Sequence, residues 1–443
     1  MRRLGMFDCQ LAIDPCRDIS IKKWIVKITT SLKSRAEPND LGGLETGFKC
    51  TPTSVYLRAT VSPVSIRSLF ESVAMNTVKR CLTLPRACCN YLLRGCLFAA
   101  ATFLLCYGSA DAQLLFVNDQ SVQSHVAQLR SEVLQRDSQE YLVPTAQQLT
   151  DFRSLADGLR DAQTTTELES LLPQAAAVGY DVVVLSDSGS TYYGLQESTT
   201  GAAQKGWGSF FLRQNASNNT LIEVAHPLHD TNTSEISVQV FVDSEAKGFL
   251  LAGAHRNANG FGTADVAHLD ESIFQEVHLS FADNASDLSV WQVHGFNIDI
   301  HPEVPSDTDA ILSAGTGSVT ELVLGLDQNI DALPGDFTSY AFNALDDSDS
   351  LNVATNGNLS GSLFSQLGGT TNVQGQHTTS IGGEFVHIEL EQSFRIDGGE
   401  SARLLASQAI TNTIIASATA VPEPSMLAIV GVFGVCFVTR RQR

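Results

Sequence analysis

The chain has 443 residues, of which 43 % are hydrophobic and 17 % are charged, and its net charge at pH 7 is −20. This charge is concentrated in residues 113–420, which hold 39 acidic and 10 basic side chains, whereas residues 1–112 and 421–443 are both net basic. A region this acidic excludes a nucleic-acid-binding protein, which needs clustered Lys and Arg to neutralise phosphates.

Cysteine has the opposite distribution, because all nine cysteines lie outside residues 113–420. Disulfides, thiolate metal ligands and a cysteine nucleophile are therefore excluded from that region. All ten histidines lie inside it, and nine of them fall between His226 and His387.

A basic segment followed by a short apolar run predicts an internal secretory signal peptide over residues 75–112. Lys79, Arg80, Arg86 and Arg94 precede an apolar run at 95–107, and Ala110-Asp111-Ala112 is a small-x-small cleavage signal. The run is shorter than the roughly 20 residues that span a bilayer, which favours a signal peptide over an N-terminal anchor. Residues 1–74 are then an over-extended gene start that is not made; the alternative is a long signal peptide with an unusual leader.

The body of the chain, residues 113–420, combines helical and strand patterns. Residues 113–180 carry leucine and valine at helical spacing and predict a helical N-terminal segment. In residues 181–420, strands are predicted at 181–185, 221–225, 248–252, 289–293, 310–312 and 385–390, and helices at 271–282, 319–330 and 400–416; residues 236–241 fit either type. This alternation predicts an α/β fold with a mixed, mostly parallel sheet flanked by helices, as in phosphorylase/hydrolase-like proteins.

Residues 331–383 are rich in Gly, Ser, Asn, Asp and Thr and predict long loops. Within them, residues 368–377 combine glycines with hydrogen-bonding side chains, a pattern that serves as a ligand-covering lid in other proteins. Asn372 and His377 are accordingly predicted to bind substrate.

Several histidines directly follow predicted strands. His226 follows residues 221–225, His255 follows 248–252 and His294 follows 289–293. The carboxyl ends of parallel strands are where functional residues collect in α/β proteins. Because the body has no cysteine, zinc would be held by two histidines and one carboxylate, with a fourth position open for water, as in catalytic zinc sites.

Residues 220–395 resemble the zinc carboxypeptidase-like superfamily, which includes N-formylglutamate amidohydrolases and poly-γ-glutamate hydrolases. The resemblance is carried by His226 and Glu235 after one strand, His294 after a later strand, and Glu389 on a late strand. It implies that His226, Glu235 and His294 bind Zn²⁺ and that Glu389 is the general base.

The family pattern puts Glu three residues after the first His, where this chain has His229. Asp230 or His229 could therefore replace Glu235 as a ligand. Glu391 is a rival for Glu389, because strand residues two apart share a face.

Two of the eight arginines of the body stand near these motifs. Arg256 directly follows His255, which we assign to substrate binding, and Arg395 follows the late strand. Arginine suits bidentate recognition of a carboxylate, so Arg256 or Arg395 is predicted to anchor a carboxylate-bearing substrate.

The chain ends in a tail that resembles the PEP-CTERM family of sorting signals. Val421, Pro422, Glu423 and Pro424 precede an apolar run at residues 426–438 and a terminal arginine cluster. The resemblance implies a transient inner-membrane helix and removal of the tail by an exosortase-type membrane enzyme; the alternative is an ordinary tail anchor.

Together these patterns predict an exported, zinc-dependent amide hydrolase of the cell envelope or exterior. It would act on a small molecule or peptide that carries a carboxylate, and it would not bind nucleic acid. The alternative is a non-catalytic surface or matrix protein displayed through the tail.

Overall fold

The computed structural model describes residues 50–51, 54–55, 112–198, 204–283, 287–302, 304–316, 318–342 and 366–419. The chain divides into two compact units, Met1–Tyr107 and Gly108–Arg443. In the first unit, β1 (Cys50–Thr51) and β2 (Ser54–Val55) pair antiparallel. The predicted signal peptide before Ala112 and the predicted sorting tail, including Val421, Pro422, Glu423 and Pro424, lie outside the described residues.

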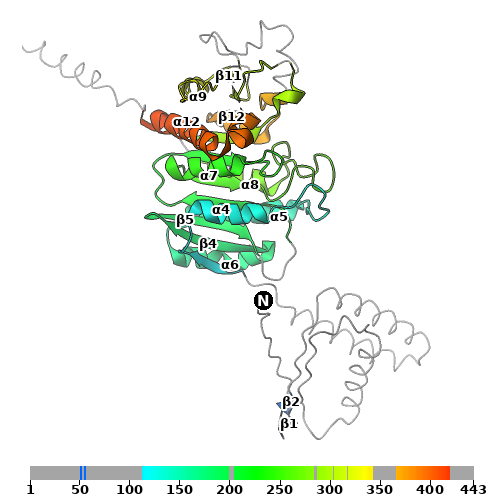
Figure 1. Cartoon of the computed structure of the whole chain (residues 1–443). Helices are drawn as coiled ribbons and strands as arrows, with labels where there is room; N and C mark the ends of the chain where they lie inside the picture. The colour runs from blue at the N-terminus through cyan, green and yellow to red at the C-terminus, as the bar shows by residue number, and fades with distance from the viewer. Residues whose placement is uncertain are drawn as a thin grey trace, which may run out of the picture. The chain divides into compact units, whose positions relative to one another are not determined.

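The second unit is built on a ten-stranded sheet with the order β11-β10-β12-β9-β7-β8-β6-β5-β4-β3 (Figure 1). Its strands are β3 (Leu114–Val117), β4 (Tyr180–Asp187), β5 (Ser190–Glu197), β6 (Ser209–Arg213), β7 (Thr220–Val224), β8 (Gly248–Leu251), β9 (Ser289–Gly295), β10 (Ala310–Ser313), β11 (Ser339–Ala341) and β12 (Glu384–Leu390). Five neighbouring pairs are parallel and four are antiparallel. The prediction of a mixed, mostly parallel α/β sheet is confirmed.

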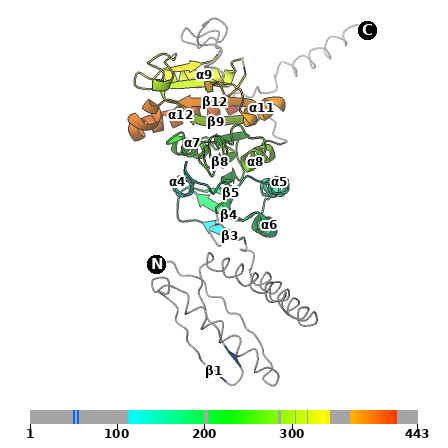
Figure 2. The ribbon, with the colours of Figure 1, turned by 90° about the vertical axis from the view of Figure 1, so that its right-hand side faces the viewer.

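Helices cover both faces of this sheet and enclose a hydrophobic core on each (Figure 2). One core is formed with α4 (Val122–Ser131), α7 (Thr233–Asp243), α9 (Glu321–Asp331) and α12 (Gly399–Thr419). The other is formed with α5 (Ala146–Asp161), α6 (Thr165–Val178) and α8 (Ile273–Ala282), and α11 (Val373–Ser380) contacts α8 on the same side. Apolar residues of the central strands therefore face a helix layer whichever way they point, as expected for the buried strands of an α/β sheet.

Local sequence explains where several helices begin. Thr145 and Thr164 form capping boxes at the starts of α5 and α6, each accepting a backbone hydrogen bond while the Gln or Glu three residues later binds the cap residue. Ser272 caps α8 in the simpler way, through a bond from the backbone N–H of Gln275.

The segment at residues 113–180 is mainly helical, as expected, but it begins with β3, which pairs in parallel with β4. Its helices α4, α5 and α6 pack on the two faces of the same sheet. The ambiguous residues 236–241 belong to a helix, α7. Residues 331–383, expected as loops, contain β11 and α11 among the residues described there.

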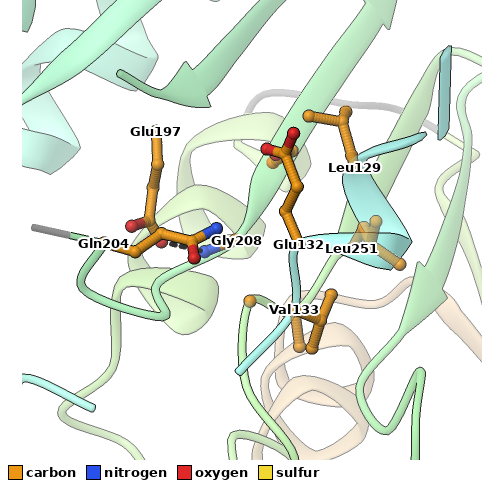
Figure 3. A pocket seen from close by; sticks show the side chains of 10 residues that line it. Leu129, Glu132, Val133, Glu197, Gln204, Gly208 and Leu251 are labelled. Carbon is orange, nitrogen blue, oxygen red and sulfur yellow. Dashed lines mark hydrogen bonds between the residues drawn. The ribbon is translucent and has the colours of Figure 1, made fainter. Parts of the chain in front are cut away.

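The loop at residues 204–208 is tied to β5 by a partly buried carboxylate. Glu197 accepts hydrogen bonds from the backbone N–H groups of Lys205, Gly206, Trp207 and Gly208, at distances between 2.5 and 3.3 Å. Figure 3 shows Glu197 beside a small cavity of about 20 Å³, which has room for about one water molecule. This carboxylate is fully used in holding the loop.

Four neighbouring strands, β12, β9, β7 and β8, run parallel to one another and so end at one edge of the sheet. His226 lies two residues after β7, His294 lies at the end of β9, and Glu389 is the penultimate residue of β12. The fold therefore collects the residues singled out from the sequence at one place. Among the helices of the described ranges, none has the length and apolar character needed to cross a bilayer.

Candidate metal centre

Three side-chain atoms converge at the carboxyl edge of the parallel strands. His226 Nδ1 lies 3.2 Å from Asp230 Oδ2, His294 Nδ1 lies 3.1 Å from the same oxygen, and the two Nδ1 atoms are 3.1 Å apart. His226 and Asp230 are brought together by one turn of chain, in which the N–H of Asp230 donates to the carbonyl of His226 at 2.9 Å. All three residues are at most 4 % exposed.

The outer nitrogens of both histidines are held by acceptor oxygens. His226 Nε2 donates to Asp265 Oδ1 at 2.8 Å, and His294 Nε2 donates to Gln292 Oε1 at 2.6 Å. A neutral imidazole that carries its proton on Nε2 has a lone pair on Nδ1. The surrounding groups thus direct two Nδ1 lone pairs and one carboxylate oxygen at a common point, which is how second-layer acceptors orient histidine ligands in metalloproteins.

The separations of the three atoms fit a tetrahedral metal ion. Zn–N and Zn–O bonds of about 2.0–2.1 Å place neighbouring ligand atoms about 3.3 Å apart at the tetrahedral angle. The observed 3.1–3.2 Å differs from that by less than the change that small side-chain rotations produce. The buried histidine and carboxylate groups are compatible with a bound metal ion.

Electrostatics favour the ligand forms of two of these residues. Burial opposes ionisation of Asp230, but the neighbouring imidazoles of His226, His229 and His294 hold its pKa well below the usual range. Burial lowers the pKa of His294, which keeps that imidazole neutral. Burial also disfavours charging of His226, but its hydrogen bonds to Asp230 and Asp265 raise its pKa overall. A metal ion at this point would take the place of the proton that His226 otherwise holds.

A second group of buried residues adjoins the first through His294. Ligand atoms of His294, His387 and Glu389 all lie within 4.8 Å of one another. The His387 ring stacks on the His294 ring at a centroid distance of 4.8 Å, and His387 Nε2 lies 3.8 Å from Glu389 Oε1. His387 Nδ1 is buried without a hydrogen-bond partner. Burial, and then the neighbouring His294, lower the pKa of His387 well below its usual value.

Glu389 is the carboxylate of β12 that reaches this cluster. It is 8 % exposed, and burial together with the charge of Asp230 raises its pKa well above the usual range for a glutamate. Its rival Glu391 lies just past the end of β12, where it accepts a hydrogen bond from the backbone N–H of Ser393 at 2.5 Å. Glu391 therefore caps the following turn.

Glu235 is the predicted ligand that the structure does not bring to the centre. It lies in the first turn of α7, its side chain is 47 % exposed, and it pairs with Arg403 Nε at 3.0 Å. Its place among the ligand atoms is taken by Asp230, one of the two alternatives that the sequence left open. Asp230 lies in the turn between β7 and α7, whereas Glu235 points from α7 towards α12.

The two arginines have different surroundings. Arg256 forms an ion pair with Asp265 beside the metal centre, and its side chain is 28 % exposed. Burial opposes ionisation of Asp265, but His226 and then Arg256 lower its pKa to about 2. Arg395 is only 4 % exposed, and each of its three nitrogens donates to a backbone carbonyl, so it does not serve as a substrate anchor.

The three predicted substrate-binding residues are spread around the centre. His255 is 7 % exposed; its Nδ1 accepts from the N–H of Asn257, and its ring lies 5.4 Å from that of His229. Asn372 caps α11 and also donates to Gln292 Oε1. His377 lies on α11, where its Nδ1 is 3.0 Å from His278 Nε2. The second half of the segment expected to be a flexible lid, from Val373 onward, is thus a helix.

A buried polar network connects the metal centre with α8 and α11. Gln292 Nε2 donates to Glu223 Oε2 at 3.0 Å, and Glu223 Oε1 accepts from His278 Nδ1 at 2.8 Å. Since Glu223 can only accept, it fixes the Gln292 amide with its oxygen towards His294. His278 on α8 and His377 on α11 belong to this network.

Comparisons with known proteins add little to this picture. A scan against models of protein families finds no match, and a search of curated proteins finds no relative. Among solved structures, the chain is similar to a candidate metallopeptidase from Shewanella denitrificans, at 12 % identity over 58 % of this chain and 91 % of that chain, with a TM-score of 0.28. At so low a TM-score the likeness carries no weight in assigning a function.

Two partly exposed side chains, His229 and Arg256, contact the carboxylates of the centre and form its rim. His229 Nδ1 donates to Asp230 Oδ1 at 2.8 Å, and its side chain is 44 % exposed. Arg256 lies next to Asp265 on the same rim. His226, Asp230 and His294 thus lie below a rim of imidazole and guanidinium groups, although residues 113–420 as a whole are strongly acidic.

Proposed function

We propose that the protein is a zinc-dependent hydrolase of amide bonds that acts on a carboxylate-bearing substrate. The observation that carries this proposal is the convergence of His226 Nδ1, Asp230 Oδ2 and His294 Nδ1 within 3.2 Å of one another, with both outer imidazole nitrogens held by acceptors. Three nitrogen and oxygen ligands with a fourth position free are typical of catalytic zinc sites.

His226, Asp230 and His294 would hold the ion, which supplies a Lewis acid that polarises a carbonyl group and activates water. Glu389 is the general base: its carboxylate takes the proton of the attacking water and returns it to the nitrogen of the leaving amine. A group in this double role must take up and then release one proton in each turnover. Burial and the charge of Asp230 raise the pKa of Glu389 above that of an exposed glutamate. His387 lies beside Glu389, with its Nε2 3.8 Å from Glu389 Oε1.

The rim residues Arg256 and His229 would orient the substrate. Arg256 is the arginine of this rim, and its ion pair with Asp265 Oδ2 uses Nη2. A substrate carboxylate would approach the remaining face of its guanidinium. The exposed ring of His229 adds a second hydrogen-bonding group there.

Export and sorting are proposed from the sequence patterns at the two ends of the chain. The basic segment, apolar run and Ala110-Asp111-Ala112 support a signal peptide, and Val421-Pro422-Glu423-Pro424 with its apolar run and arginine cluster supports processing by an exosortase-type enzyme. The substrate would then be met in the cell envelope or outside the cell. The cysteine-free body suits such a compartment, because its folding does not depend on redox conditions.

The test measures metal content and hydrolysis together. Purified protein should hold about one zinc ion per chain and should hydrolyse some members of a panel of N-acyl amino acids and γ-glutamyl peptides. Removal of the metal with a chelator should abolish turnover, and added Zn²⁺ should restore it. Metal-free protein after purification without chelators, and no binding of added Zn²⁺, would contradict the proposal.

A non-catalytic surface protein is the second candidate, and the burial of the centre favours it. Asp230, His387 and Glu389 are each at most 8 % exposed, as in structural metal sites that are closed to substrate. Bound zinc without turnover on any substrate of the panel, combined with a large loss of thermal stability on metal removal, would support this second candidate.

A further inference from the structure

The side chain of Arg395 joins three segments that follow site residues. Its Nε donates to the carbonyl of Leu390 at 2.8 Å, Nη1 to that of Thr231 at 3.0 Å and Nη2 to that of Phe296 at 2.8 Å. Leu390 directly follows Glu389, Thr231 directly follows Asp230, and Phe296 comes two residues after His294. One guanidinium thus touches the chain just beyond each of these three side chains.

Gly295 and Asn232 pack closely around Arg395. A Cβ added to Gly295 would lie 2.3 Å from Arg395 Cζ, so any larger residue between His294 and Phe296 would displace the guanidinium from this position. The backbone of Arg395 is held as well, because Asn232 Nδ2 donates to its carbonyl at 2.8 Å. Asn232 has φ +67°, a left-handed conformation that asparagine tolerates better than most residues. The turn after Asp230 and the segment after β12 therefore each donate a hydrogen bond to a carbonyl of the other.

The sheet alone does not hold Asp230, His294 and Glu389 in place relative to one another. Glu389 and His294 belong to hydrogen-bonded neighbours, β12 and β9, and the N–H of Phe296 also donates to the carbonyl of Leu390 at 3.0 Å. Asp230, in contrast, lies in the turn between β7 and α7, outside any ladder. Arg395 Nη1 and Asn232 are the contacts that tie this turn to the end of β12.

Arginine is suited to this task because its five N–H groups lie in one rigid plane and cannot lose the charge in a protein. Three carbonyl acceptors around one planar fork are fixed relative to one another. Lysine offers a single ammonium on a flexible stem, which holds no such fixed arrangement.

We propose that Arg395 is a positioning residue of the metal centre, which sets the spacing of Asp230, His294 and Glu389 by holding the three carbonyls that follow them. This inference rests on the proposed function, since it takes Asp230 and His294 to be metal ligands. It replaces substrate anchoring as the role of Arg395.

The test uses the full-length chain and the binding of Zn²⁺ and Co²⁺, with Arg395→Lys and Arg395→Ala as variants. Arg213→Lys and Arg213→Ala are matched controls, because Arg213 is also a buried arginine, donates to the carbonyl of Val242 and lies on β6 away from the centre. We expect the Arg395 variants to remain folded and to bind both metals about 10–100-fold more weakly, the usual effect of losing a group that orients metal ligands. Their Co²⁺ complexes should show altered visible absorption, and millimolar guanidinium should restore part of the affinity of Arg395→Ala. The Arg213 variants should bind and absorb like the parent protein.

The outcomes separate this inference from the proposed function. If the parent protein binds neither Zn²⁺ nor Co²⁺, the metal centre itself is refuted. If the parent binds both metals and the Arg395 variants match it in affinity and absorption, only the role of Arg395 is refuted. If circular dichroism shows that both Arg395 variants are unfolded, Arg395 is a general folding residue and the proposal is equally overturned.

Discussion

His294 and Glu389 stand directly opposite each other in the register of the neighbouring parallel strands β9 and β12. Adjacent strands lie about 4.8 Å apart, so the proposed general base is one strand spacing from a proposed metal ligand. Both residues are held by sheet hydrogen bonds. The relative position of ligand and base is consequently a property of the sheet and does not rely on a mobile loop.

We predict that His226→Ala, Asp230→Ala and His294→Ala each lose the bound metal and the hydrolytic activity. Each change removes one of three protein ligands from a site at the edge of the sheet, so most of the fold should survive. Glu235→Ala is the matched control: it should keep metal and activity, because Glu235 pairs with Arg403 on the outside of α7. Elemental analysis of the purified variants measures the result, and metal loss in Glu235→Ala would restore Glu235 as a ligand.

Glu389→Gln should separate catalysis from metal binding. The amide cannot accept a proton, so turnover should fall about 10²–10⁴-fold while metal content stays at the parent level. Glu391→Gln should change turnover by only a few-fold, since Glu391 caps the turn at Ser393. Equal losses in the two variants would show that the base has been assigned to the wrong residue.

Asp265→Asn is expected to weaken metal binding about 10–100-fold without removing a ligand. Asp265 accepts the Nε2 proton of His226 and so directs its Nδ1 towards the centre. Asp283→Asn is a suitable control, because Asp283 also pairs with an arginine, Arg153, but on the outside of α8. Isothermal titration with Zn²⁺ compares the affinities, and the prediction is wrong if both variants bind equally well.

Stability should depend on pH through His125, far from the metal centre. Burial lowers the pKa of His125 below its usual 6.5, and its ring is held by Gln120 and Gln196. As pH falls through 6.5 the unfolded chain takes up this proton before the folded chain does, so the free energy of unfolding decreases. Urea unfolding at pH 7.5 and 5.5 should show a smaller decrease for His125→Gln than for the parent. An identical decrease in the two proteins would exclude this contribution.

The exported protein should begin near Gln113. Cleavage after Ala112 follows from the small-x-small signal behind an apolar run of about 13 residues. N-terminal sequencing of the secreted fraction decides the matter, and a start at Met1 or Met75 would refute the prediction.

The sequence was sufficient for the fold class where strands carry unbroken aliphatic runs, as in residues 182–185 of β4, which are buried on both faces. It was ambiguous for α7, because Ile236, Val238 and Val240 alternate as in a strand. In the structure Ser234 and Ser237 are buried as well, so this helix is buried nearly all round. It was misleading for α11, whose buried residues Gln374 and Thr378 are polar and whose partners are other buried polar groups.

For the site, the histidines at strand ends were found because register places the ends of parallel strands together. Asp230 could not be preferred over Glu235, because the choice depends on which way α7 faces. That orientation follows from the burial of residues such as Ile236, Val240 and Phe241, which leaves Glu235 on the outside beside Arg403. The role of Arg395 depends on three backbone carbonyl groups far apart in sequence. Every residue has such a carbonyl, so the residue types at these positions could not reveal the contacts. His387 carried a signal that could have been used, since it lies two residues from Glu389 on the same face of β12.

The loop held by Glu197 has a consequence for how the protein opens. Releasing Lys205, Gly206, Trp207 and Gly208 together would leave the partly buried carboxylate of Glu197 without these donors, a cost that local fraying cannot recover. A glycine-containing surface loop normally exchanges its amide protons quickly with solvent. These four amides should instead exchange as slowly as those of the central strands, so the loop and the sheet open as one cooperative unit.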